Sequence, residues 1–295
     1  MVTKDDHIQF KQHGLINKVL EATGMTECNH KKTPASRTPL GTDANGAPFQ
    51  ESWKYSSIIG MLMYLAANAH PEIQFAVHQC ARFTHCPKQS HANAIKRICH
   101  YLKWVIHEKG GLTFKKEAGY QLDCFVDADY AGLWSFEHDQ DPVSVKSRTG
   151  YVITLAGCPV HWVSKLQTCI ANSTLEAEYI AMAQAMRELV PMRRLLQEIV
   201  SVTDPENSSH NTLFKSTLFE DNNGAISTAT APNLTPRTKH IAVRYHYTRS
   251  QIELDEKKPG IHIEKVSTEF QLADILTKGL DQETFEHLRK LLCNW

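Results

Sequence analysis

The sequence has little of what marks several protein classes. Its 295 residues include 14 glycines and 12 prolines, too few for a low-complexity chain. The 32 basic and 32 acidic side chains cancel, which excludes a polybasic protein that binds nucleic acid over its whole surface. The longest apolar run, 58–67, is about half as long as a membrane-spanning helix, and no apolar leader begins the chain. We therefore expect a globular intracellular protein with no membrane partner.

Cysteine is present but forms no recognisable framework. The eight cysteines are scattered, and none belongs to a Cys-x-x-Cys pair. Without a secretion signal, a disulfide framework is not expected. Cys80 and Cys86 lie near several histidines, but their spacing fits no usual pair of zinc ligands. The sequence predicts free cysteines that serve mainly as small apolar residues.

Apolar periodicity divides the chain into two parts. Helical spacing at 14–24, 56–69 and 91–106 surrounds a stretch rich in Pro, Gly and small polar residues, 29–53, which predicts a linker. Beyond residue 120 the pattern predicts five strands, at 122–127, 149–157, 159–164, 217–221 and 261–266, with a tight turn at Gly157-Cys158. Helices are predicted at 173–199, 224–230, 241–254 and 272–279, the first kinked or split at Pro191. This order predicts an α/β fold, a mixed five-stranded sheet with helices packed on it.

One window of this neutral chain is strongly basic. Residues 73–107 contain no acid but five lysines or arginines and five histidines. Such a helical region is a candidate phosphate-contacting surface, and the alternative is a solvated face whose counter-ions come from other segments. The substrate-binding residues predicted here are Arg82, Lys96, Arg97 and Lys103.

Acidic residues recur at the ends of the predicted elements. Asp127 ends the first strand, Asp221 ends the fourth, and Asp274 lies in the last helix. Glu176 and Glu178 open the long helix, but two residues on a helix differ by about 200°, so only one can face a shared site. Glu178 lies in the apolar stripe that must face the sheet, and is therefore the better ligand. Clustered carboxylates persist mainly where a divalent metal neutralises them.

Several motifs resemble the ribonuclease H region of copia-type LTR-retrotransposon Pol polyproteins. They are Phe-Val-Asp-Ala-Asp-Tyr-Ala-Gly at 125–132, Ser-Arg-Thr-Gly-Tyr-Val at 147–152, Ser-Thr-Leu-Glu-Ala-Glu-Tyr-Ile-Ala at 173–181, Glu-Asp-Asn-Asn-Gly-Ala-Ile at 220–226, Arg-Thr-Lys-His-Ile-Ala-Val-Arg-Tyr-His at 237–246 and Gln-Leu-Ala-Asp-Ile-Leu-Thr-Lys at 271–278. Upstream, residues 14–20, 59–66 and 97–103 resemble the end of that family's reverse transcriptase. The resemblance implies a ribonuclease H-like fold preceded by a mainly helical reverse-transcriptase thumb/connection-like region.

The same resemblance predicts a domain order. We expect the end of a palm-like remnant, a linker, the helical thumb/connection-like region, the ribonuclease H-like domain and a C-terminal helix or tail, at 1–28, 29–53, 54–115, 120–281 and 282–295. The polymerase palm carries adjacent aspartates between two apolar strands. Here the only such pair, Asp5-Asp6, precedes a polar stretch. No polymerase activity is therefore expected from this chain alone.

The function that the resemblance implies is cleavage of the RNA strand of an RNA–DNA hybrid. Asp127, Glu178, Asp221 and Asp274 would be the catalytic and metal-binding residues, holding two Mg²⁺ ions for which Mn²⁺ could substitute. Besides the hybrid, the implied partners are a polymerase palm and other polyprotein products. The implied location is a cytoplasmic virus-like particle or the nucleus.

Alternatives stay open at this point. Lys239 and Arg244 are further candidate substrate contacts, although the Arg237–His240 stretch could simply start a helix with Thr238 as its N-cap. The whole chain could be a non-catalytic nucleic-acid-binding remnant of a decayed element. An integrase or transposase would share the sheet topology, but those enzymes end their acidic triad in Glu, whereas the last acid here is Asp274.

Overall fold

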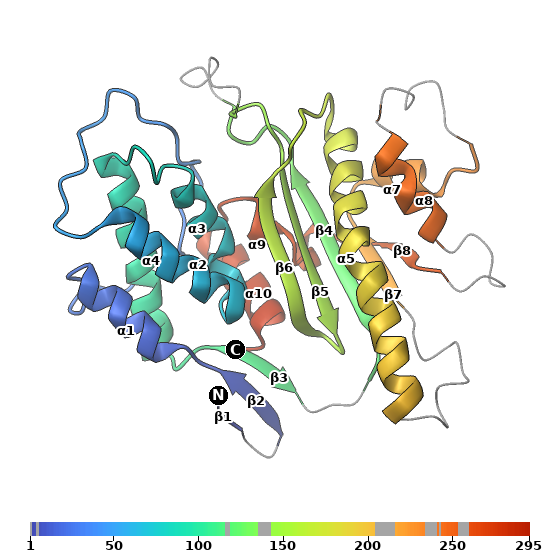
Figure 1. The fold of residues 1–295 in the computed structure, drawn as a ribbon, viewed down its shortest axis with the longest axis horizontal. Helices are drawn as coiled ribbons and strands as arrows, with labels where there is room; N and C mark the ends of the chain where they lie inside the picture. The colour runs from blue at the N-terminus through green and yellow to red at the C-terminus, as the bar shows by residue number, and fades with distance from the viewer. Residues whose placement is uncertain are drawn as a thin grey trace. The chain divides into compact units, whose positions relative to one another are not determined.

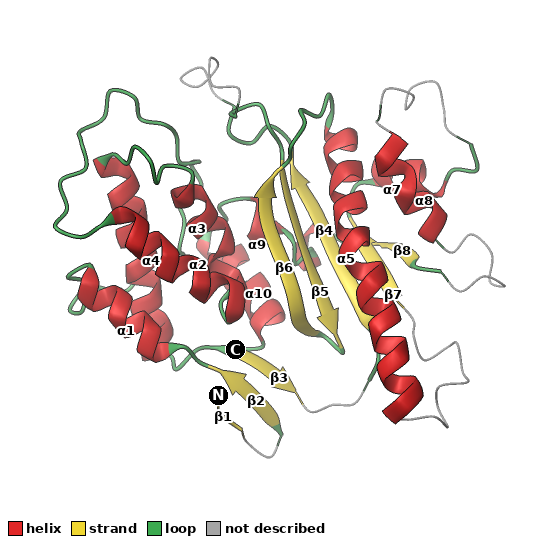
Figure 2. Cartoon of the chain, in the orientation of Figure 1, coloured by secondary structure: helices red, strands yellow, loops and turns green. Residues whose placement is uncertain are grey.

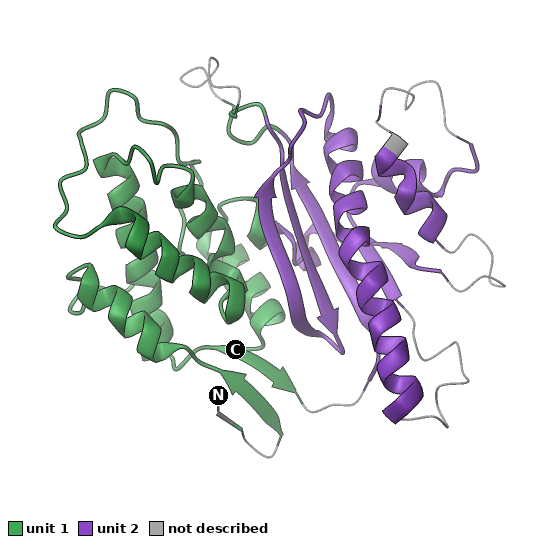
Figure 3. Ribbon diagram, in the orientation of Figure 1, with its two compact units in different colours: residues 1–116, 131–145, 275–295 green, residues 117–130, 146–274 purple. Residues whose placement is uncertain are grey.

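Two compact units make up the computed structural model of the protein (Figure 3). The structure describes residues 2–3, 6–115, 119–134, 143–203, 216–233, 241, 243–252 and 260–295. Unit 1 comprises residues 1–116, 131–145 and 275–295, and unit 2 comprises residues 117–130 and 146–274. The expected tail 282–295 thus belongs to the same unit as the N-terminal residues. The boundaries of the five expected domains stay a prediction.

Helices form most of unit 1 (Figures 1 and 2). They are α1 (His13–Ala22), α2 (Tyr55–Asn68), the 3₁₀ turn η1 (Pro71–Ile73), α3 (Gln74–Ala81), α4 (Gln89–His107) and α10 (Gln282–Cys293). Apolar residues at three- and four-residue steps of α4 are fully buried, namely Ile95, Ile98, Leu102 and Val105. The helices predicted at 14–24, 56–69 and 91–106 are therefore confirmed, as is the mainly helical character of 54–115.

Unit 1 also contains a small sheet that the sequence did not predict. Its strands β1 (Val2–Thr3), β2 (His7–Phe10) and β3 (Leu112–Lys115) are antiparallel in the order β1-β2-β3. Asp6 consequently lies between two strands, whereas the sequence predicted only a polar stretch after it. Two- and four-residue strands carry too little alternation to detect, and the partner of β2 is distant in sequence. Residues 7–10 and 112–115 are nevertheless held in one ladder.

A buried polar cluster ties α10 into the core of unit 1. Glu72 is fully buried and lies 2.9 Å from Nδ1 of His70. The Tyr101 hydroxyl and the Cys293 thiol both donate to its carboxylate, at 3.4 Å each. Buried charges need such partners, because an unpaired one is costly. Since Cys293 is in the last turn of α10, the C-terminal helix completes the environment of a residue near the start of α3.

Unit 2 is built on a mixed five-stranded sheet (Figure 1). The strands are β4 (Leu122–Asp129), β5 (Arg148–Leu155), β6 (Cys158–Leu166), β7 (Ser216–Glu220) and β8 (His262–Lys265), in the order β6-β5-β4-β7-β8. The pairs β6–β5 and β5–β4 are antiparallel, whereas β7 and β8 run parallel to β4. The prediction of an α/β fold with a mixed five-stranded sheet is confirmed.

One long helix covers the sheet of unit 2. Helix α5 (Thr174–Thr203) shares one buried core with Cys124 and Val126 of β4, to which it contributes Met182, Ala185 and Leu189. The shorter elements are α7 (Asn223–Thr230), the 3₁₀ turns η4 (Val243–His246) and η5 (Thr268–Phe270), α8 (Tyr247–Gln251) and α9 (Asp274–Thr277). Alternating apolar residues thus form the β4 face that α5 buries, as expected for a half-covered sheet.

Three local predictions need correction. Helix α5 is not split at Pro191, because it runs unbroken from Thr174 to Thr203 with this exposed proline inside it. The helix expected at 241–254 is instead η4 followed by α8, which ends at Gln251. The β5–β6 turn consists of Ala156 and Gly157, both with positive φ (48° and 74°), because a two-residue hairpin turn of this kind needs positive φ at both positions.

Candidate active site

Two aspartates lie just beyond the part over which β4 and β7 pair. Asp221 directly follows β7, whereas Asp127 lies within β4, two residues before its end at Asp129, and so does not end the strand as the sequence predicted. Strands β4 and β7 pair in register, with Phe125 opposite Phe219, and the two rings stack 4.6 Å apart. Asp127 and Asp221 each follow their phenylalanine by two residues. Because side chains on a strand alternate between its faces, Asp127 lies on the same face of β4 as Phe125, and Asp221 directly follows the last residue of β7. The register of the sheet therefore brings them together.

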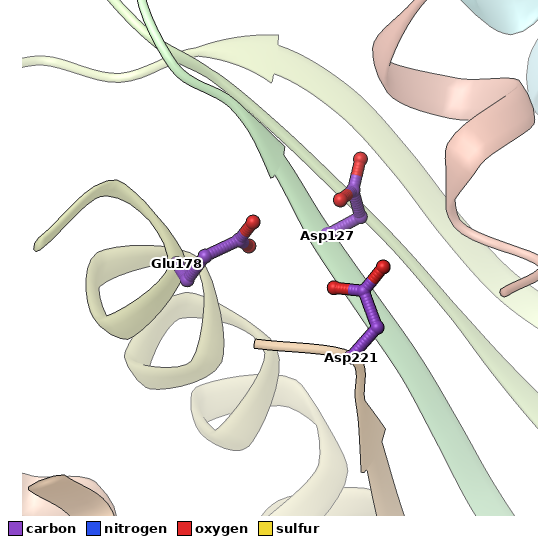
Figure 4. A group of neighbouring side chains, drawn as sticks. All are labelled: Asp127, Glu178 and Asp221. Atoms are coloured by element: carbon purple, nitrogen blue, oxygen red, sulfur yellow. The ribbon is translucent and has the colours of Figure 1, made fainter. Parts of the chain in front are cut away.

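Helix α5 adds a third carboxylate to this pair (Figure 4). Glu178 lies near its N-terminal end and points toward Asp127 and Asp221. One carboxylate oxygen from each of the three residues lies within 4.8 Å of the other two. Asp127 and Glu178 are each only 4% exposed, so water screens their mutual repulsion poorly. Three acidic side chains are thus concentrated in one small, mostly dry volume.

Glu178 has acidic neighbours, and within the described part of the chain one of its carboxylate oxygens has no hydrogen-bond partner. Burial raises the pKa of Glu178, and the carboxylates of Asp127, Glu220 and Asp221 raise it further, against an opposing backbone hydrogen bond from Ala128. Its Oε2 is buried and has no hydrogen-bond partner among the described residues. A hard divalent cation coordinates carboxylate oxygens and neutralises their charge. The donor set therefore fits Mg²⁺ or Mn²⁺.

Glu176, the alternative to Glu178, caps the N-terminal end of helix α5. Its Oε2 accepts hydrogen bonds from the backbone N–H and the side-chain amide of Asn172, at 2.8 and 2.9 Å. Its own backbone N–H donates to Oγ of Ser173 at 3.1 Å. This arrangement satisfies N–H groups that have no partner within the first turn of a helix. The structure thus gives the two glutamates different places, Glu176 in the cap and Glu178 in the carboxylate group.

Asp274, the fourth predicted ligand, stands outside the group of three. It opens α9 and is 2% exposed. Its backbone N–H donates to the Gln271 carbonyl at 3.1 Å, and the Gln271 side chain donates to the Val126 carbonyl at 2.9 Å. The turn that carries Asp274 is therefore attached to β4 one residue before Asp127, although its carboxylate is not among those within 4.8 Å of each other.

Glu220 is an acid of this region that the sequence analysis did not single out. It is the last residue of β7, is fully buried, and accepts a hydrogen bond from the Asn222 N–H at 3.0 Å. Burial raises the pKa of Glu220, and the nearby charges of Asp127 and Asp221 add to this effect. The available signal was the pair Glu220-Asp221 at a strand end, because adjacent strand residues face opposite sides and one of the two must point inward.

Comparisons with known proteins place the chain in a family. No protein-family model matches it. It is 31% identical over 281 residues to the retrovirus-related Pol polyprotein from transposon RE1 of Arabidopsis thaliana, which covers 95% of this chain and 18% of that polyprotein. It is 32% identical over 287 residues to the corresponding polyprotein from transposon TNT 1-94 of Nicotiana tabacum, covering 95% and 20%. The chain belongs to the copia-type Pol polyproteins.

This Pol chain spans about a fifth of the length of the curated relatives it matches. Among solved structures, it is similar to the N-terminal RNase H domain of Rv2228c from Mycobacterium tuberculosis, at 11% identity and a TM-score of 0.35. That similarity covers 58% of this chain and 98% of the solved domain. Every helix in the described part of the Pol chain is too short or too polar to cross a bilayer.

The basic window of the Pol chain makes extensive internal contacts. Lys96 pairs with Glu51 at 2.6 Å, and Arg97 donates to Oγ1 of Thr33 at 2.7 Å. Arg82 and Lys103 donate to the backbone carbonyls of Leu40 and Thr26, at 3.3 and 2.5 Å respectively. All four predicted substrate contacts therefore hold the segment 26–51 against the helices of unit 1. This is the structural alternative to a phosphate-contacting role, which stays a prediction.

The other two predicted substrate contacts lie beyond the long helix. Arg244 is exposed, and its guanidinium donates to the neighbouring Tyr245 hydroxyl at 2.9 Å and covers that ring at 4.8 Å. Lys239 and the whole stretch 237–240 lie outside the described residues. An exposed guanidinium that is already oriented by an aromatic ring retains donors for a phosphate.

Substitution of two lysines of α4 tests whether the basic window contacts phosphates or has only a structural role. Glu51 neutralises Lys96, whereas Lys103 is bonded to an uncharged carbonyl and keeps its positive charge. If the window contacts phosphates, Lys103→Gln should reduce the slope of log affinity for a hybrid against log salt concentration by about one. Lys96→Gln, the matched control on the same helix, should leave the slope unchanged. If both variants had the same salt dependence of hybrid affinity as the wild type, the basic window would have a structural role alone.

Proposed function

We propose that this Pol chain is a ribonuclease H-type nuclease that cleaves the RNA strand of an RNA–DNA hybrid during retrotransposon reverse transcription, using divalent cations. The observation that carries the proposal is the group of three carboxylates, Asp127, Glu178 and Asp221, with oxygens within 4.8 Å of one another. The buried Oε2 of Glu178, without a partner in the described part of the chain, supports a cation at this place. Membership of the Pol family supports the choice of substrate.

The roles of the residues follow from their positions. Asp127, Glu178 and Asp221 would hold the cation, and we keep Asp274, on the turn attached to β4, as a fourth ligand. Bound Mg²⁺ would activate the attacking water and stabilise the leaving oxygen of the phosphodiester. The residues of the chain preorganise that chemistry. The stacked rings of Phe125 and Phe219 hold the ends of the two strand segments that carry the aspartates.

Recognition of the hybrid would depend on shape and charge. RNA-containing duplexes are recognised mainly through groove shape, phosphates and 2′-hydroxyls. A nuclease that degrades an RNA template of any sequence needs no base-specific contacts, so this mode of recognition suits it. Lys103 and Arg244 are the described basic residues that we propose as phosphate contacts, because neither is neutralised by a carboxylate that the structure shows. We propose no polymerase activity for this chain.

A non-catalytic hybrid-binding remnant is the second candidate. The observation that favours it is the position of Asp274, whose carboxylate stands outside the group of three. Such a protein would bind a hybrid with a similar dependence on salt, yet would leave the RNA strand intact in every divalent cation.

Metal removal separates the two candidates. We expect the purified chain to cut the labelled RNA strand of a hybrid in Mg²⁺, to stop when a chelator is added, and to recover when Mn²⁺ is supplied in excess, because three repelling carboxylates need a cation. Gel analysis of the RNA products measures this directly. Single-stranded RNA and duplex DNA of the same sequence serve as control substrates. Binding without cleavage in both metals would contradict the nuclease and support the remnant.

A further inference from the structure

Glu220 has an unusual environment for a strand residue. Its side chain is fully buried at the end of β7. One carboxylate oxygen, Oε1, accepts the backbone N–H of Asn222 at 3.0 Å. The other, Oε2, is buried and has no hydrogen-bond partner within the described residues. An acceptor that is buried without a partner costs free energy, so a protein retains it only where something else satisfies it.

The neighbours of Glu220 indicate what that partner is. The carboxylates of Asp127 and Asp221 act electrostatically on Glu220, and Glu220 in turn acts on Glu178. Glu220 is therefore close enough to sense all three members of the carboxylate group, although it is not among those whose oxygens lie within 4.8 Å of one another. A fourth buried acid at this place increases the repulsion, which either a proton or a bound cation can relieve.

We propose that Glu220 is an additional acidic group of the cation site, acting on the bound ion from just outside the three carboxylates. This inference rests on the proposed function. Mg²⁺ keeps several of its water molecules when it binds proteins, and a nearby carboxylate that accepts hydrogen bonds from such water stabilises the ion without touching it. Oε2 of Glu220 is the acceptor available for this purpose.

A purely structural role for Glu220 is the competing explanation. Oε1 holds the Asn222 N–H, and Oδ1 of Asn222 accepts the N–H groups of Gly224 and Ala225, which caps helix α7. The tight contact of this turn with α5 is visible at Gly224, where an added Cβ would lie 2.9 Å from Cδ1 of Leu175. In that case, any side chain that keeps the acceptor for Asn222 would serve equally well.

Glu220→Gln distinguishes the two explanations. Glutamine has nearly the same shape and retains an oxygen for the Asn222 N–H, but it removes the charge and replaces the second oxygen by a donor. The readout is Mn²⁺ affinity of the full chain, measured by electron paramagnetic resonance without substrate. We expect the dissociation constant to rise about tenfold, as is typical when an outer partner of a metal site is lost.

Matched variants make the result decisive. Glu176→Gln is the same change in a buried glutamate of the helix cap, and it should leave Mn²⁺ affinity within about twofold of the wild type, since Glu176 lies outside the carboxylate group. Circular dichroism checks that each variant is folded. If Glu220→Gln binds Mn²⁺ as tightly as Glu176→Gln, the inference is wrong while the proposed function stands. If the wild-type chain itself binds no Mn²⁺, the proposed function fails and this inference fails with it.

Discussion

Replacement of Asp127 by Asn is expected to reduce hybrid cleavage by more than about a hundredfold, beyond the loss that outer partners of a metal ligand usually cause. Asp127 lies on the central strand β4, and its oxygen is within 4.8 Å of those of both Glu178 and Asp221. Asparagine keeps the size and one oxygen but removes the charge that holds a cation. The measurement is the single-turnover rate of RNA cleavage in Mg²⁺.

Hybrid binding provides the control for this variant. Loss of one buried negative charge relieves repulsion, so Asp127→Asn should fold at least as stably as the wild type and bind the hybrid with similar affinity in the absence of metal. A variant that kept more than a tenth of the wild-type cleavage rate would show that Asp127 is not a ligand. Loss of binding together with cleavage would instead indicate damage to the sheet.

The second large effect is expected at Glu178, in contrast with Glu176. Glu178→Gln removes a carboxylate from the group of three and should reduce cleavage as severely as Asp127→Asn. Glu176→Gln should leave the cleavage rate nearly unchanged, because its carboxylate is bonded to Asn172 in the helix cap. Rates of the two variants, measured side by side on one hybrid, give the comparison.

Thermal stability should show the opposite order for these two variants. A capping interaction typically contributes about 0.5–2 kcal/mol, so Glu176→Gln should lower the melting temperature slightly. Glu178→Gln should not lower it, since burial and three neighbouring carboxylates already oppose the charge there. If Glu176→Gln proved the inactive variant and Glu178→Gln the active one, the assignment of the two glutamates would be reversed.

Helical geometry and strand period explain why part of the site could be predicted. The choice of Glu178 over Glu176 needed the angle between two helical positions and the apolar stripe, and the structure places Glu176 in the helix cap and Glu178 in the carboxylate group. Register cannot be read from one strand. The pairing of Phe125 with Phe219, which aligns Asp127 with Asp221, depends on two segments far apart in sequence.

The contacts of the basic side chains could not be predicted for the same reason. Charge counting finds that residues 73–107 are basic, but it does not identify partners such as Glu51 or the Thr26 carbonyl. Glu51 lies in the segment 29–53, whose composition predicts a linker and gives no sign of its contact with α4, and Thr26 lies just before that segment. Glu220 was overlooked because burial of a charged residue contradicts the ordinary expectation for glutamate, and only its unpartnered oxygen draws attention to it.

The buried contact between Glu72 and Cys293 has a consequence for the order in which the chain matures during synthesis. Residues 275–295 of unit 1 leave the ribosome after every residue of unit 2, whose last residue is Asp274. Until α10 is made, Glu72 lacks the Cys293 thiol, and Tyr101 lacks the ring of Phe285 that packs edge-on against it at 5.6 Å. Unit 2 can therefore finish folding first, while the helices of unit 1 wait for a segment translated after it.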